Sequence, residues 1–129
     1  MAAVPVTSEI AQRAAILGFN DLPDDLVERT KQCLLDWFAV TLAGAQDELT
    51  DILIQETLED GGRGPASLVG RKEKVTPSAA TLINGAASHA LDYDDVNFAM
   101  GGHPNVTVVP ALLSLGEQRK ASGRLFIES

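Results

Sequence analysis

Hydrophobic and polar residues alternate at helical spacing most clearly between Asp24 and Ala43. The inward-facing positions of this segment follow one another at steps of three and four residues; they are Leu26, Thr30, Cys33, Leu34, Trp37, Phe38, Thr41 and Leu42. A proline and two aspartates open the segment, and Gly44 closes it. The pattern predicts one long amphipathic helix over residues 24–43.

Shorter amphipathic segments lie on either side of this helix. The first runs from Thr7 to Gly18, with Ser8 as a candidate N-cap and the glycine as a stop. The second runs from Asp47 to Glu59 and combines a stripe of leucine and isoleucine with an acidic face that should meet water. We predict a helix for each segment.

The helical period is lost between Gly64 and Val75. Two short runs, 66–69 and 74–75, are joined by a turn that begins at Gly70. Short apolar runs around a glycine turn are typical of a β-hairpin. The sequence predicts a small hairpin here.

Two apolar helices are predicted in the second half of the chain. Thr76 is a candidate N-cap before Pro77 at the first helical position, and the alanine-rich segment 79–90 has apolar residues on nearly every face. Residues 106–115 are almost wholly apolar, with Pro110 in or near the first turns of the predicted helix. Both segments should be buried on several sides.

Two segments remain: the stretch between these two helices and the end of the chain. Residues 91–104 have no sustained period and are predicted to form a loop. Residues 121–124 look like the cap and first turn of a further helix, which gains little alone because nucleation is the costly step. The fold class predicted is mainly α, with about five helices and one small β-hairpin, and we expect a fragment or naturally shortened version of a longer protein.

Composition narrows the class of protein. The 129 residues are 45% hydrophobic and 22% charged, which is typical of a folded domain. The net charge of −8 and the lack of a large basic cluster argue against a nucleic-acid partner. A single cysteine, Cys33, and an N-terminus unlike a signal peptide favour a cytoplasmic location. No stretch is long and apolar enough to span a bilayer, so no membrane partner is expected.

Most of the candidate chemistry lies between residues 88 and 104, which contain both histidines of the chain. His89 and Asp92 follow a buried helix and could exchange protons in a partly dry cleft. Asp92 is the preferred catalytic candidate because it comes directly after that helix. His89 could instead be a core histidine that holds Asp92 in place, and Asp94 and Asp95 could be caps or solvated loop acids.

His103 lies between a glycine pair and Pro104, which starts the next predicted helix. Glycines let the backbone approach a ligand, and a helix N-terminus favours an anion. A plain surface-loop histidine is the alternative.

Metal and cofactor motifs are weak in this chain. Asp92 and Asp94 open like a calcium loop, but Val96 and Asn97 occupy positions that such a loop needs for a ligand and a glycine. The two histidines match no standard zinc spacing, and no phosphate-binding glycine loop occurs. We expect no metal and no cofactor.

Three separated motifs carry a family resemblance. They are His-Ala-Leu-Asp-Tyr-Asp-Asp at 89–95, Gly-His-Pro at 102–104 and Val-Val-Pro-Ala-Leu-Leu at 108–113. Together they resemble the MmgE/PrpD family, which includes 2-methylcitrate dehydratases, cis-aconitate decarboxylases and an iminodisuccinate epimerase. Segments 36–44 and 67–70 also look like its N-terminal portion. Family members have an all-helical domain built from both chain ends and an inserted α+β lid, so residues 1–129 would be a partial helical domain without the lid and the C-terminal helices.

The resemblance also implies a site and a reaction class. Asp92 and His103 would be the catalytic pair, and the substrate-binding positions would be His89, Asp95, Val96 and Asn97. Some members carry threonine where this chain has Val96. The implied reaction is acid/base chemistry next to a carboxylate of a small di- or tricarboxylate, without cofactor, in a homodimer. Dehydration, decarboxylation and epimerisation all stay open.

Charge sets a limit on what this chain does alone. From Val75 to Gln118 there is no lysine or arginine, whereas four acidic side chains are present. A polycarboxylate cannot be held by that stretch alone. By the resemblance, the family's substrate-binding lysines lie beyond Ser129. We therefore expect the chain alone to be inactive; the alternative is a non-catalytic helical module that self-associates or binds a partner through an exposed apolar face.

Overall fold

A computed structural model describes residues 5–129, and the described part is mainly α, as predicted. It contains six α-helices, one short 3-10 turn and one two-stranded antiparallel sheet. In chain order the elements are α1 Val6–Ile16, η1 Phe19–Asp21, α2 Asp24–Gly44, α3 Glu48–Glu59, β1 Arg63–Ser67, β2 Lys74–Val75, α4 Pro77–His89, α5 Pro104–Arg119 and α6 Gly123–Glu128. Among the described helices, none is long and apolar enough to cross a membrane. The first four residues, part of the stretch that argues against a signal peptide, lie outside the described residues.

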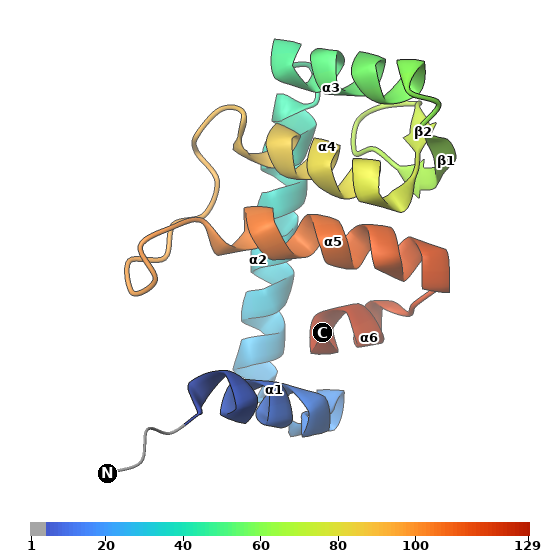
Figure 1. Cartoon of the computed structure of the whole chain (residues 1–129). Helices are drawn as coiled ribbons and strands as arrows, with labels where there is room; N and C mark the ends of the chain where they lie inside the picture. Colours follow the sequence, from blue (N-terminus) through green and yellow to red (C-terminus); the bar gives the residue numbers. More distant parts are fainter. Residues whose placement is uncertain (1–4) are drawn as a thin grey trace.

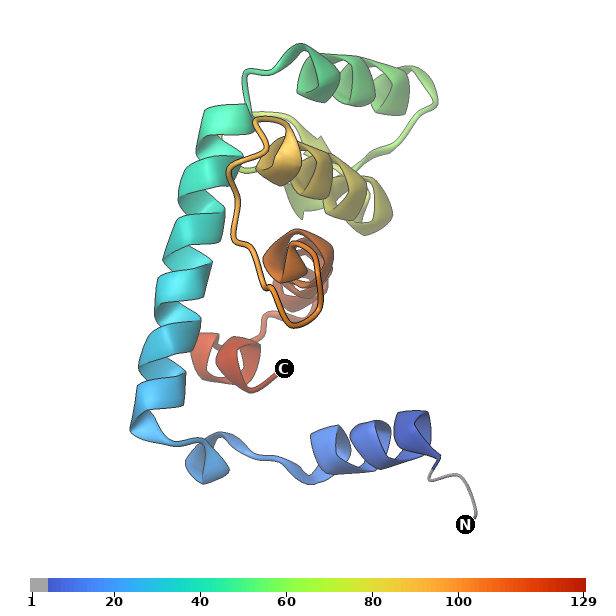
Figure 2. The ribbon, with the colours of Figure 1, turned by 90° about the vertical axis from the view of Figure 1, so that its left-hand side faces the viewer.

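Helix α2 is the axis of the molecule. Helices α4 and α5 lie side by side and both cross it, while α3 packs along α4 (Figure 1). In the turned view α1 extends from the opposite end of α2, away from these helices (Figure 2). Helix α1 contains no buried residue. The site-bearing ends of α4 and α5 are thus held by α2 and by each other.

The core forms where α4 meets α2, α3 and the sheet. A buried apolar cluster contains one residue of α3, three of the two strands and the segment that connects them, and two of α4. Its members are Ile54, Ala66, Leu68, Val75, Ala80 and Ile83. Asn84 fastens the hairpin to α4, since its Oδ1 accepts from the Val69 amide at 2.9 Å and its Nδ2 donates to the Ser67 carbonyl at 3.0 Å. Apolar burial supplies the main driving force, and the asparagine fixes the register.

Several predicted boundaries differ from the observed ones. Pro5, not Ser8, is the N-cap of α1, and this helix ends at Ile16 because Leu17 is extended. Strand β1 begins at Arg63, three residues before the predicted run, and pairs with β2 as expected. The predicted cap at Thr76 is confirmed, because its side chain accepts from the Ala79 amide.

Helix α5 is longer than the apolar run that predicted it. It begins at Pro104, with His103 as its N-cap, and continues to Arg119. Pro110 lies inside it and has no N–H to donate to the Val106 carbonyl. That carbonyl faces Gly85 of α4, where a Cβ would lie 3.4 Å from the oxygen. The two helices are thus in direct contact near the site, at a distance that a Cβ at position 85 would just fit.

Candidate active site

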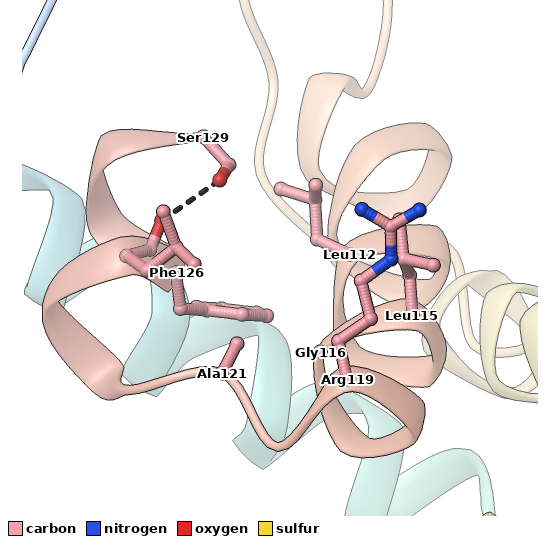
Figure 3. Close-up of a pocket in the computed structure, with 8 residues that line it drawn as sticks. Leu112, Leu115, Gly116, Arg119, Ala121, Phe126 and Ser129 are labelled. Atoms are coloured by element: carbon pink, nitrogen blue, oxygen red, sulfur yellow. Dashed lines mark hydrogen bonds between the residues drawn. The ribbon is translucent and has the colours of Figure 1, made fainter.

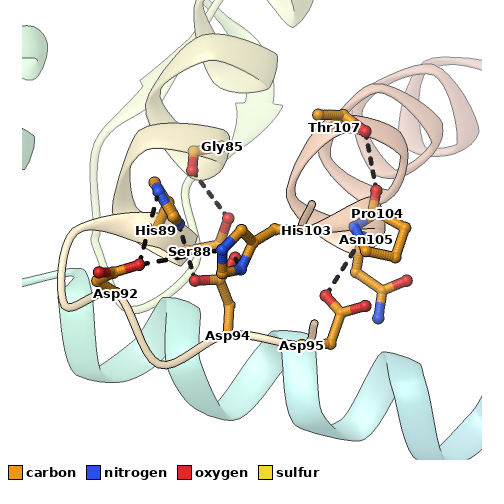
Figure 4. Close-up of polar contacts among 10 residues, drawn as sticks. All are labelled: Gly85, Ser88, His89, Asp92, Asp94, Asp95, His103, Pro104, Asn105 and Thr107. Carbon is orange, nitrogen blue, oxygen red and sulfur yellow. Dashed lines mark hydrogen bonds and ion pairs between the residues drawn. The ribbon is translucent and has the colours of Figure 1, made fainter. Parts of the chain in front are cut away.

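The ends of α4 and α5 bring the two histidines of the chain together. Helix α4 ends at His89, and the loop 90–103 returns so that His103 caps α5 beside it, with ring centroids 4.7 Å apart (Figure 4). Asp92 has a φ of 52°, a left-handed conformation that aspartate tolerates better than most residues, and this reverses the chain after α4. Fourteen residues of separation along the chain become direct ring contact.

Asn97 closes the outer part of the same loop. The backbone N–H of Asn97 donates to the Gly102 carbonyl at 2.9 Å, and its side-chain Oδ1 accepts from the backbone amides of Ala99 and Met100. The side-chain oxygen of this predicted substrate-binding residue is thus engaged in shaping the loop. Val96, the residue before it, is exposed.

Asp94 lies between the two imidazoles and is the most buried charged group of the cluster. Its side chain is only 1% exposed, and its Oδ1 is 2.8 Å from His89 Nδ1. Its Oδ2 is 3.2 Å from His103 Nδ1, but the two atoms are not aligned for a hydrogen bond. Both of these atoms are buried and have no hydrogen-bond partner among the described residues. One buried carboxylate therefore contacts both rings.

Asp92 lies at the open side of the cluster. Its side chain is 81% exposed, and its Oδ1 is 4.0 Å from Nε2 of His89 and 4.0 Å from Nε2 of His103. The expected pairing of His89 with Asp92 is thus a loose contact, whereas the hydrogen bond of His89 goes to Asp94. The inner nitrogens of both rings face Asp94, and the outer nitrogens lie near Asp92.

Two pKa values in the cluster are displaced. The hydrogen bond to Asp94 raises the pKa of His89 above its ordinary value, against a smaller opposing effect of burial. Burial raises the pKa of Asp95, and the nearby charges of Asp94 and Asp36 act in the same direction. The Asn105 amide donates to Asp95 Oδ1 at 3.3 Å and partly offsets this rise. The surroundings therefore favour the charged form of His89 and the neutral form of Asp95.

Three of these side chains could also offer ligands to a metal ion. The nearest ligand atoms of His89, Asp94 and His103 all lie within 4.8 Å of one another. Ligands about 2.1 Å from a tetrahedral zinc lie roughly 3.4 Å apart, however, which is farther than the 2.8 Å between His89 Nδ1 and Asp94 Oδ1. The observed spacing is that of a direct hydrogen bond.

The cavities of the described chain lie elsewhere. One of about 210 Å³ is a partly open hollow between α5 and α6 and is lined mostly by apolar side chains around Phe126 (Figure 3). Arg119 is its only charged lining residue, and the hydroxyl of Ser129 is bonded to the Leu125 carbonyl. This hollow offers no acid/base pair, so we place the chemistry at the histidine cluster.

Asp94 is the residue of the cluster that the sequence pattern left undecided. It could equally have been a cap or a solvated acid, because no period runs through the loop that contains it. Its burial arises from tertiary packing of the loop against neighbouring helices, which local sequence signals do not report. The other predicted residues at the cluster are His89, Asp92, Asp95 and His103.

The sequence of this chain is similar to those of known proteins. A family model for the MmgE/PrpD N-terminal domain matches residues 8–129. A cis-aconitate decarboxylase of Aspergillus terreus is 31% identical over 119 residues, which are 92% of this chain and 24% of that protein. The cis-aconitate decarboxylases of Mus musculus and Homo sapiens are 29% and 26% identical over 113 residues, 87% of this chain and 23% of theirs. The chain spans about a quarter of the length of these relatives.

Proposed function

This chain belongs to the MmgE/PrpD family, and from that premise we propose that it supplies the proton-transferring part of an active site for small polycarboxylic acids. The reaction takes place at a carbon next to a carboxylate. The proposed groups are Asp92 and His103, with His89 beside them. Decarboxylation of a substrate like cis-aconitate is the form of this chemistry that the names of the relatives favour.

The observation that carries the proposal is the pair of imidazoles at the junction of α4 and α5. Both Nε2 atoms lie 4.0 Å from the same oxygen of Asp92, at the exposed side of the cluster. Groups that can accept or donate a proton thus converge on one accessible place. A solitary surface histidine would not have a second ring and a buried carboxylate behind it.

The chemistry follows from what a leaving carboxylate requires. When the bond between the methylene carbon of cis-aconitate and its carboxylate breaks, carbon dioxide leaves, and the electron pair is delocalised through the adjacent carbon–carbon double bond onto the carbon next to the carboxylate at the other end of the molecule. An imidazolium delivers a proton to that carbon and becomes neutral, and a proton from water restores it. Cations must neutralise the remaining carboxylates, and segment 75–118 contains no lysine or arginine. Residues outside this segment must supply them.

A chimera tests the proposal. Residues 8–129 would replace the matching segment of the Aspergillus terreus decarboxylase, and release of carbon dioxide from cis-aconitate would be measured. We expect turnover in the folded chimera and a loss of roughly 100-fold or more in the variants Asp92→Asn and His103→Gln, the scale of general acid/base contributions. Asp60→Asn, at the C-cap of α3, removes the same charge far along the chain and should leave turnover unchanged.

Two results would contradict the proposal. One is a folded chimera, judged by circular dichroism and elution volume, that does not turn over any of several small polycarboxylates. The other is full turnover in both site variants. Asparagine tolerates the left-handed backbone of position 92, so the aspartate variant removes the charge with little strain.

A second proposal is that the chain self-associates through an apolar surface, as a homodimer or as a non-catalytic module. Its support is the lack of any buried residue in α1, together with large apolar side chains that are exposed on several elements. Those exposed by more than 60% are Val6, Ile10, Ile16, Leu35, Leu82 and Phe98. So much exposed apolar area is typical of an interaction surface.

Oligomeric state distinguishes the two proposals when combined with the chimera. Light scattering after size exclusion, over a dilution series, should show a mass above 13.6 kDa that falls with dilution. A monodisperse monomer at all concentrations would refute self-association. Self-association with an inactive, folded chimera would favour the non-catalytic module.

A further inference from the structure

We propose that Asp94 is a positioning residue that holds both imidazoles through their Nδ1 atoms and thereby turns both Nε2 atoms toward Asp92. The inference rests on the proposed function for its catalytic meaning, but its geometry is independent of any substrate. It also makes His89 the second proton-carrying ring of the site, in addition to His103. A core or surface role for either ring would not require a shared carboxylate.

The geometry has three parts. Asp94 Oδ1 is at hydrogen-bond distance from His89 Nδ1, 2.8 Å, and Oδ2 lies 3.2 Å from His103 Nδ1. The carboxylate is 1% exposed, so water does not compete for its oxygens. The rings themselves are 47% and 27% exposed, which leaves their outer nitrogens accessible. The inner side of the pair is closed and the outer side is open.

Orphaned atoms support the shared role. Asp94 Oδ2 and His103 Nδ1 are buried without a hydrogen-bond partner among the described residues, although they are 3.2 Å apart. A buried unpaired carboxylate oxygen is costly, and a ring nitrogen that could donate to this one, His103 Nδ1, lies within hydrogen-bond distance. Hydrogen bonds of catalytic groups are often poorly aligned before substrate binds. The two atoms are each other's natural partners.

The consequence concerns which nitrogen carries the proton. A ring that donates from Nδ1 to a carboxylate has Nε2 free to accept or deliver a proton. Asp94 has two oxygens and can accept from both rings at once. Other titratable groups around the pair are Asp92 and Asp95 in the same loop and, beyond Asp95, Asp36 of α2. Among these, Asp94 alone contacts both inner nitrogens.

Long-range proton–nitrogen NMR spectra of the chain test this directly. In the neutral state both rings should carry their proton on Nδ1, although a neutral histidine in water favours the proton on Nε2. The protonated Nε2 form of either ring, above its titration, would overturn the proposal. This measurement uses the unaltered protein, so it does not depend on how a variant folds or on catalytic turnover.

A variant pair separates the hydrogen bond from simple charge. In Asp94→Asn the amide oxygen can accept from only one ring, so at most one ring should keep its proton on Nδ1, and the titration midpoint of His89 should fall because the hydrogen bond that raises its pKa is lost. Asp95→Asn removes the same charge from the same loop and should leave the tautomers and the His89 midpoint unchanged. Equal effects of the two variants would refute a specific role for Asp94. If both rings carry their proton on Nδ1 but the chimera does not turn over a substrate, the proposed function is contradicted and the role of Asp94 is not.

Discussion

The crossing of α2 and α4 makes Gly44→Ala the sharpest test of how the fold supports the site. A Cβ built at Gly44 would lie 2.0 Å from the Ala87 carbonyl oxygen and 3.0 Å from its carbon. The obstacle is backbone, so it cannot rotate away as a side chain does. Ala87 is two residues before His89, and any displacement of α4 is passed to the imidazole pair.

The magnitude follows from two opposing effects. Moving the Cβ from 2.0 Å to even 3.0 Å separates the helices and disrupts close packing, and overpacking of this kind costs about 1–3 kcal/mol. Alanine returns at most about 1 kcal/mol through its better helix propensity, and less at the last residue of a helix. Because the clash is against rigid backbone, we expect a net loss of about 2 kcal/mol in the free energy of unfolding.

Urea unfolding followed by far-ultraviolet circular dichroism measures this loss. Gly116→Ala is the matched control, since its Cβ would meet only Phe126 and Ala121 at 3.6 and 3.8 Å, which is ordinary contact. That variant should be as stable as the parent or slightly more stable. If Gly44→Ala were as stable as Gly116→Ala, the close crossing of α2 and α4 would be refuted. A lower pKa of His89 in Gly44→Ala would show that the displacement reaches the site.

Three further results are expected. Asn84→Ala should lower the free energy of unfolding by about 2 kcal/mol because the Val69 amide and the Ser67 carbonyl lose their partner, and an unchanged urea midpoint would contradict this. Asp95→Asn should gain stability relative to the parent as pH rises above 3.8, since the raised pKa of Asp95 means that the folded state loses stability when this carboxyl ionises; a difference that does not vary with pH would refute it. The chain alone should not turn over cis-aconitate in an NMR assay because segment 75–118 has no lysine or arginine to hold the substrate carboxylates, and turnover abolished by Asp92→Asn would contradict this.

The sequence predicted those features of the fold that depend on residues close together along the chain. The three- and four-residue spacing along 24–43 and the cap at Thr76 describe interactions within one or two turns, and both the helix and the cap agree with the structure. Leu26 and Leu42, which were predicted to face inward, are exposed. Boundaries that depend on neighbours were less accurate. Helix α5, for example, continues past the predicted apolar run to Arg119. In this polar last turn Glu117 accepts a hydrogen bond from the Ser67 amide of β1, a contact between residues far apart in the sequence.

The candidate site shows the same division. The motif identified the residues that could carry protons, because histidines and aspartates were concentrated in one stretch. It preferred Asp92 to Asp94 as the catalytic candidate but did not predict that Asp92 is almost fully exposed and Asp94 almost fully buried. That difference arises when α4, α5 and the loop pack together, and a loop without periodicity carries no local sign of it. The hydrogen bonds from Asn84 to the hairpin could not be predicted from the sequence for the same reason.

The most direct test of the central claim, that this chain carries the proton to the substrate carbon, is deuterium incorporation by the chimera in heavy water. Each turnover of cis-aconitate should place one solvent deuteron on the carbon next to the carboxylate at the other end of the molecule, where the electron pair is delocalised when carbon dioxide leaves, and His103→Gln should reduce the rate of this step by roughly 100-fold or more. NMR and mass spectrometry of the product measure both quantities. A product without solvent deuterium, or a rate of incorporation that is unaffected by His103→Gln and by Asp92→Asn, would contradict the account.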